Sequence, residues 1–225
     1  DFERYVTLDY WHFVSAPVSG QAIDNAFMTA SGITSTPAHQ FYRWDEDTQY
    51  WIIYGSTGNP EAFGDTEFVA GRGYALVRSS DGDLNFTGTP ETSDISYAAT
   101  HTGLYERVGF NLVGNPFSCA LGMTNSATSS GKFLADNTAL LDDNYEAAYI
   151  WDEQAGYAFD RNDYKVISNA AISGYTQLAQ DYIQPGQAFM VKVVAGGGNI
   201  EFNADMRAHA GVNFYKKGEE WPSVE

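Results

Sequence analysis

The sequence predicts an all-β protein made of two copies of one structural unit. Aromatic residues make up 15% of the chain, which also contains 22 glycines, and this composition favours strands joined by tight turns over helices. The stretch FYRWDE at residues 41–46 returns as AYIWDE at residues 148–153. In each copy, five polar or small residues and then an aromatic one, Tyr50 or Tyr157, follow the Trp. This is the pattern of a strand, a turn and a second strand.

Four blocks of sequence recur in the same order, and the offset between the copies grows only in the loops. The matched pairs are Pro17 with Pro116, Trp44 with Trp151, Gly71 with Gly186 and Phe86 with Phe202. Such a pattern is expected of a duplicated supersecondary unit whose loops accept insertions. We therefore expect two pseudo-symmetric copies of a roughly five-stranded unit, about ten strands in all, forming a β-sandwich-like body.

The two copies set the expected organisation of the chain. The first β repeat is placed at residues 1–90, a connecting segment at 91–106, the second β repeat at 107–215 and a C-terminal linker at 216–225. Alternation at Ile95 and Tyr97 suggests that the connecting segment pairs with a sheet. The halves are thus expected to share one compact body.

The first copy begins with two predicted strands, at residues 2–8 and 10–16. Pro17 ends the second of them, because proline cannot donate a ladder hydrogen bond. Ile23 and Phe27, four residues apart, predict one or two short helical turns around them.

A second hairpin is predicted where Asp81-Gly82 separates residues 71–78 from residues 84–87. Both turn residues tolerate the positive φ that a two-residue turn requires. The second copy repeats the order of the first, in the segments 109–116, 149–153, 186–191 and 200–202.

Charge and cysteine content exclude several classes of function. The formal net charge of −17 would repel nucleic acid and anionic membranes. The single cysteine, Cys119, permits no intrachain disulfide and no cysteine-based zinc site. No apolar run approaches the roughly 20 residues of a membrane span, and Asp1 opens directly into a strand-like segment, as in a mature or excised piece.

The sequence predicts no catalytic residues. Asp45 and Glu46 are adjacent, as are Asp152 and Glu153, whereas glycoside cleavage needs two carboxyls about 5 to 10 Å apart across a cleft. We expect the Asp of each pair to hydrogen-bond the backbone of its own turn. The four histidines are dispersed and form no zinc-binding set.

Calcium is the one cofactor for which the sequence offers ligands. The cluster Asp160, Asn162 and Asp163 carries suitable oxygens, and residues 141–144 hold a similar group. Neither has the spacing of an EF-hand loop, and solvated turns are the alternative interpretation.

Aromatic side chains give the positive indication of function, because Trp and Tyr rings stack on the apolar faces of sugars. The candidate ligand-binding residues are Trp51, Tyr50, Tyr157 and Trp221. Residues that recur in both copies are interpreted instead as the core of the repeat: Trp44, Trp151, Trp11, Phe110, Pro17 and Pro116. When the two copies are aligned, Trp51 corresponds to Ala158. Because the second copy has no large ring at this position, Trp51 is freer to be exposed.

The blocks at residues 110–117, 149–153, 184–191 and 202–207 resemble β-rich repeats near the end of large bacterial proteins exported by the type IX secretion system. The first copy departs from that pattern, with SAP at residues 15–17 in place of Gly-Asn-Pro and with Arg72. The resemblance implies secretion or display at the cell surface within a larger multidomain protein. It supplies no catalytic residues.

These observations predict a non-catalytic extracellular module for recognition or adhesion, with a polysaccharide or surface glycan as ligand and with the neighbouring domains of the same chain as partners. A structural spacer that binds nothing and a polysaccharide-degrading domain are the alternatives. No nucleic acid partner and no membrane insertion are expected.

Overall fold

The computed structural model describes residues 1–7, 10–33, 40–55, 62–102, 107–152 and 163–209. It confirms the predicted all-β class, because strands account for most of the regular structure in these ranges. The helices are short: α1 (Asn25–Ala30), α2 (Phe133–Asp136) and the 3-10 helix η2 (Ala204–Met206). Helix α1 lies where helical turns are predicted. None of the helices in the described ranges has the length and apolar character needed to cross a membrane.

The first half of the chain is built on a four-stranded antiparallel sheet in the order β2-β6-β4-β5. Its strands are β2 (His12–Val14), β6 (Tyr74–Leu76), β4 (Phe41–Asp45) and β5 (Tyr50–Ile53). Two smaller pairs accompany it: β1 (Phe2–Val6) with β7 (Gly82–Phe86), and β3 (Val18–Ser19) with β8 (Thr89–Pro90).

The second half is built on a five-stranded sheet in the order β10-β16-β12-β13-β14. Its strands are β10 (Phe110–Gly114), β16 (Ala188–Lys192), β12 (Ala148–Trp151), β13 (Tyr164–Ile167) and β14 (Thr176–Gln177). Around it, β9 (Ile95–Ala99) pairs with β17 (Gly198–Phe202), and β11 (Ala120–Gly122) lies between β15 (Tyr182–Ile183) and β18 (Arg207–Ala208). Strand β9 shows that the predicted connecting segment does pair with a sheet.

Strands that match along the sequence occupy the same places in the two sheets. β2, β6, β4 and β5 follow one another in the first sheet as β10, β16, β12 and β13 do in the second. The flanking pairs also correspond: β1 precedes β2 and pairs with β7, which follows β6, just as β9 precedes β10 and pairs with β17, which follows β16. A duplicated unit would give this strand order, and duplication itself stays a prediction.

One local prediction is wrong. The Asp81-Gly82 hairpin does not form, since β7 pairs with β1 and places Gly82 opposite Val6. Burial decides: Leu84 and Phe86 are fully buried in the core with Val6, and this outweighs the preference of the two-residue turn. The predicted return strand at Tyr157 lies outside the described residues, and within them β12 pairs with β13 from Tyr164 onward.

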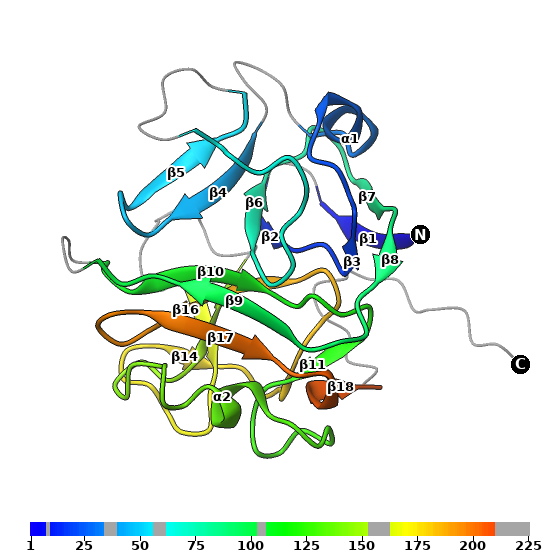
Figure 1. Ribbon diagram of the computed structural model, residues 1–225. Coiled ribbons are helices and arrows are strands. Elements are labelled where there is room, and N and C mark those ends of the chain that lie inside the picture. Colours follow the sequence, from blue (N-terminus) through cyan, green and yellow to red (C-terminus); the bar gives the residue numbers. More distant parts are fainter. Residues whose placement is uncertain (8–9, 34–39, 56–61, 103–106, 153–162, 210–225) are drawn as a thin grey trace, which may run out of the picture.

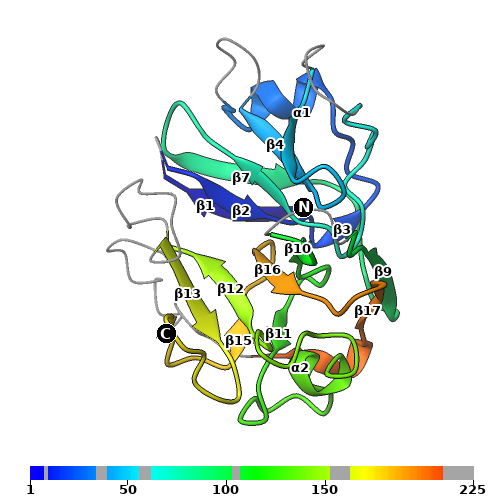
Figure 2. The same ribbon diagram turned by 90° about the vertical axis from the view of Figure 1, so that its left-hand side faces the viewer.

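Three apolar clusters lie in succession through the molecule. One is internal to the first half, around Phe41 and Phe86, and another is internal to the second half, around Phe133 and Phe189. The third joins side chains of both halves, among them Phe13, Tyr42 and Tyr149. Figure 1 shows β4, β5 and β6 above β10 and β16, and Figure 2 shows β4 above β12, β13 and β16.

The two main sheets are also joined through their backbones, in a reciprocal manner. Arg72, in the segment before β6, bridges to Val113 of β10, and Gln187, before β16, bridges to Val14 of β2. The Gly73 N–H donates to the Leu112 carbonyl at 3.0 Å. In each sheet, the segment before the second strand thus pairs with the edge strand of the other sheet. These bridges fix the distance between the two sheets.

Candidate functional site

A cavity of about 580 Å³ lies between the two main sheets, and we call it the aromatic cavity. It is lined by Trp11, Phe13, Tyr42, Trp44, Trp51, Arg107, Phe110, Tyr149, Trp151, Tyr164, Tyr175 and Met190. Its volume falls within the range of about 300 to 1,000 Å³ that is typical of small-ligand sites. Four of the five tryptophans of the chain are in its wall.

The two-residue period of the strands aims these rings at the cavity. On β4, Tyr42 and Trp44 face the cavity. Phe41, on the opposite face of the strand, belongs to the apolar core of the first half. On β12, Tyr149 and Trp151 face the cavity in the same way. The repeated Tyr-x-Trp thus supplies one wall from each half.

Each hairpin completes its wall with a cross-strand aromatic pair. Trp44 lies opposite Trp51, with ring centroids 5.3 Å apart and planes at 63°. Trp151 lies opposite Tyr164, with centroids also 5.3 Å apart and planes at 77°. Such edge-to-face pairs hold each other's orientation and add about 0.5 to 1.5 kcal/mol beyond burial. The cavity walls are therefore pre-shaped.

Phe13 of β2 lies between the two hairpins. Its ring centroid is 5.8 Å from that of Trp51 and 5.9 Å from that of Trp151. Trp11 lies directly before the same strand and packs on Tyr42 with centroids 4.8 Å apart. A buried ring thus contacts both walls and sets the floor between them.

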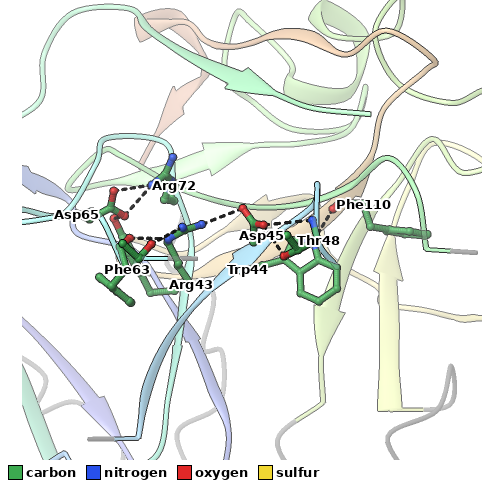
Figure 3. A network of polar contacts seen from close by, with 10 residues as sticks. Arg43, Trp44, Asp45, Thr48, Phe63, Asp65, Arg72 and Phe110 are labelled. Atoms are coloured by element: carbon green, nitrogen blue, oxygen red, sulfur yellow. Dashed lines mark hydrogen bonds and ion pairs between the residues drawn. The ribbon is translucent and has the colours of Figure 1, made fainter. Parts of the chain in front are cut away.

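Polar contacts behind Trp44 fix its side chain and its turn (Figure 3). The indole Nε1 donates to the Phe110 carbonyl at 2.7 Å. Arg43 donates to the Phe63 carbonyl at 2.6 Å and to the Asp45 carboxylate at 3.0 Å. Asp45 also accepts from the backbone N–H of Thr48 at 3.2 Å and from its hydroxyl at 2.5 Å. Asp45 therefore closes its own turn, as the sequence predicts.

The surroundings of Asp45 lower its pKa. Burial alone raises the pKa of this carboxyl, but the hydrogen bonds from Thr48 and the charge of Arg43 outweigh that effect and hold the pKa below its ordinary value. The carboxylate is thus charged at neutral pH and stabilises the end of the hairpin.

A smaller polar cavity of about 110 Å³ lies on the other side of Trp44. Its cations and anions are already engaged: Arg72 binds both oxygens of Asp65, at 2.6 and 2.7 Å, and Glu46 accepts the Gly109 N–H at 2.7 Å. Burial lowers the pKa of Arg72, but the charges of Tyr97 and Asp65 outweigh it and raise the pKa. We interpret these groups as the frame that supports the aromatic wall.

The hydroxyls of the cavity tyrosines differ in their partners. Tyr42 donates to the Gln40 side chain at 2.7 Å, and Tyr149 donates to the Tyr145 carbonyl at 3.3 Å. The Tyr164 hydroxyl makes no hydrogen bond within the described ranges. Burial raises the pKa of all three, so their hydroxyls remain protonated at neutral pH.

The candidate ligand-binding residues separate in the structure. Trp51 lines the aromatic cavity. Tyr50, its neighbour on β5, points to the other face and is 62% exposed. Tyr157 and Trp221 lie outside the described residues. The same is true of Ala158, the residue predicted to match Trp51, and the register places Tyr164 in the position that corresponds to Trp51.

The residues interpreted as repeat core also separate. Pro17 and Pro116 are buried. Trp44, Trp151, Trp11 and Phe110 line the cavity between the halves. Of these rings, Trp151 is buried and the other three are half-buried. These four rings also belong to, or pack against, the apolar cluster that joins the two halves, so the cavity wall and this cluster share them.

Sequence reasoning missed Tyr42, Tyr149, Tyr164, Tyr175, Phe13, Met190 and Arg107 as lining residues. A signal for two of them was present, because Tyr42 and Tyr149 each precede the repeated Trp by two residues and must share its strand face. The others come from segments that only the fold brings together.

The predicted calcium ligands are only partly within the described ranges. Asp160 and Asn162 lie outside them, and Asp163 is buried. Asp142, in the second acidic cluster, accepts the Asn144 N–H at 3.0 Å and pairs with Lys192 at 3.4 Å. Among the described residues no group of three or more His, Cys, Asp or Glu side chains could hold a metal.

Comparison with known proteins places the chain in a family. No curated protein and no solved structure matches it. A family model described as "Domain of unknown function (DUF8693)" matches residues 2–224, which is almost the whole chain. The protein belongs to this DUF8693 family.

Proposed function

We propose that the protein is a non-catalytic extracellular module for recognition or adhesion, which binds a glycan in the aromatic cavity. The observation that supports this most is the wall itself, since four Trp and four Tyr rings face a cavity of about 580 Å³. Sugar rings present flat C–H faces to aromatic rings, and ring hydroxyls accept from indole and phenol donors. The pre-shaped pairs Trp44–Trp51 and Trp151–Tyr164 would spare the ligand the cost of ordering the site.

The wall also bears on the alternatives. A structural spacer has no need to keep aromatic rings around an open space, because filling the space would stabilise it. A glycan-cleaving domain needs an acid and a base beside the bound sugar, and no carboxylate is among the described lining residues. Both observations favour binding. Release of reducing sugar from a panel of polysaccharides would contradict the non-catalytic proposal.

Secretion or surface display, through the type IX route and as part of a larger protein, belongs to the same proposal and rests on the resemblance of the second repeat. Fractionation of the native host would test it by locating the protein. A calcium site at Asp160, Asn162 and Asp163 is a separate proposal. Removal of calcium by a chelator should lower the melting temperature if the ion is structural, and an unchanged melt contradicts it.

Affinity electrophoresis tests glycan binding directly. Native gels cast with individual polysaccharides should retard the wild-type chain on at least one of them. Trp51→Ala should lose the retardation, because it removes one of the rings that form the cavity wall. Tyr50→Ala is the matched control, since it removes the neighbouring ring on the opposite strand face. Equal migration of the folded wild type on every gel, or retardation that only Tyr50→Ala abolishes, would contradict the proposed site.

A further inference from the structure

The aromatic cavity holds one charged side chain among its described lining residues, Arg107. This arginine is exposed although it faces the cavity, which places it toward the mouth. Its backbone is held from two sides: its N–H donates to the Gln49 side chain at 3.3 Å, and its carbonyl accepts from the Phe110 N–H at 3.3 Å. The residue is thus anchored between the turn of the first hairpin and the start of β10.

No salt bridge to Arg107 occurs within the described residues. Four other cations of this strongly acidic chain, Arg43, Arg72, Lys165 and Lys192, pair with aspartates. An arginine that keeps its guanidinium open beside aromatic walls has its planar donors available for a carboxylate.

Tyr164 supplies a second donor to the aromatic cavity, which it lines together with Arg107. Its hydroxyl, like the guanidinium, has no hydrogen-bond partner among the described residues. Burial raises the pKa of this hydroxyl, so it stays protonated at neutral pH. A protonated phenol and a guanidinium that line one cavity can both donate to a carboxylate bound in it.

We infer that the glycan carries a uronate, whose carboxylate binds between Arg107 and Tyr164 while its ring stacks on the tryptophans. The inference rests on the proposed function and narrows its ligand class. It also explains why a positive charge, that of Arg107, lies in the cavity lining. The acidic protein would otherwise repel an anionic sugar, and the guanidinium offsets this repulsion at the binding site.

Calorimetry with matched sugars tests the inference. The probes are a glucuronate-containing disaccharide, the same disaccharide with its carboxyl reduced to an alcohol, and indole-3-acetate, which offers a ring and a carboxylate without a sugar. The wild type should bind the acidic disaccharide about tenfold more tightly than the reduced one, as expected for one charge-assisted contact. Indole-3-acetate should bind more weakly than either sugar.

Three variants locate the effect. Arg107→Gln should remove the tenfold preference, so that the acidic and the reduced disaccharide bind with similar affinity. Tyr164→Phe should reduce the preference by a smaller factor, while keeping the ring that packs on Trp151. Arg207→Gln is the control, because it removes an exposed positive charge on β18, outside the cavity lining, and should keep the preference.

The outcomes separate the two proposals. Equal wild-type affinity for the acidic and reduced disaccharides overturns the uronate inference and leaves glycan binding standing. A preference that survives Arg107→Gln also overturns it. Tighter binding of indole-3-acetate than of both sugars overturns the uronate in favour of an aromatic acid. Binding of none of the three probes by folded wild type counts against the uronate, and failure on the neutral polysaccharide gels as well then overturns glycan binding.

Discussion

The indole N–H of Trp44 donates a hydrogen bond to the carbonyl of Phe110, 66 residues away, at 2.7 Å. Both residues line the aromatic cavity, and each belongs to a different half of the chain. The bond therefore ties one cavity wall to the other. Trp44 is therefore held in the cavity wall by its hydrogen bond to Phe110 as well as by the packing of its ring on Trp51.

This bond gives a prediction for stability. Trp44→Phe keeps a ring but removes the donor, so it should lower the free energy of unfolding by about 1 kcal/mol more than Trp51→Phe, whose indole has no hydrogen bond within the described ranges. Urea unfolding followed by circular dichroism measures the difference. Equal destabilisation by the two variants would show that the hydrogen bond to Phe110 contributes nothing.

Glu46 makes a second connection between the halves. It is 4% exposed, and its carboxylate accepts the backbone N–H groups of Gly109 at 2.7 Å and of Thr102 at 3.2 Å. Glu46→Ala leaves buried donors without a partner and should cost about 2 kcal/mol. Asp47→Ala, at the exposed neighbouring position, should change stability by less than about 0.5 kcal/mol. A loss no larger for Glu46→Ala than for this control would refute the role of Glu46.

Asp45 predicts how the hairpin responds to acid. Its folded pKa lies below the ordinary value of 3.8, so its contribution to stability is present in full above that value and is lost as the pH falls through the folded pKa. The stability difference between wild type and Asp45→Asn should therefore be constant from neutral pH to about pH 5 and shrink below pH 4. Chemical unfolding at a series of pH values measures it. A difference that persists unchanged at pH 2 would contradict this linkage.

Gly73 predicts how closely the sheets must approach. A Cβ atom at this position would lie 2.7 Å from both Ala188 Cβ and Leu112 Cγ, which is closer than carbon atoms pack. Gly73→Ala should cost about 1 to 3 kcal/mol through overpacking. Adding Ala188→Gly should return part of the loss, because it removes one of the three contacts shorter than 3.0 Å, the third being with the Val113 carbonyl oxygen at 2.9 Å. If the double variant is as unstable as the sum of the single ones, the contact is not the cause.

The local parts of the fold could be predicted from the sequence, and the long-range pairings could not. The Trp44 hairpin and the turns of α1 follow from residue spacing within a few positions. The pairing of β7 with β1 depends on which apolar faces can be buried together across about eighty residues of sequence. The Asp-Gly turn signal at residues 81–82 describes only its own neighbourhood and gave the wrong partner.

The sequence predicted the kind of recognition at the candidate site but not most of the residues that form it. Aromatic richness indicated ring-stacking recognition, and Trp51 lies in the cavity wall. The recurrence of Trp44 and Trp151 favoured a core interpretation, because a single repeat offers no reason to keep a large ring exposed. In the structure these rings pack in the cluster between the two halves of the chain and also line the cavity there. Arg107 and Tyr164 come from unrelated segments, so no spacing in the sequence could have joined them.

The central claim is that a glycan occupies the aromatic cavity, and intrinsic tryptophan fluorescence tests it most directly, since four of the five tryptophans are in the wall. Titration with a polysaccharide that retards the wild type should give a saturable change in emission. Tyr50→Ala should give the same curve, and Trp51→Ala should bind at least about tenfold more weakly, as expected for the loss of one stacking contact. Unchanged affinity in folded Trp51→Ala, or binding without any change in emission, would contradict the claim.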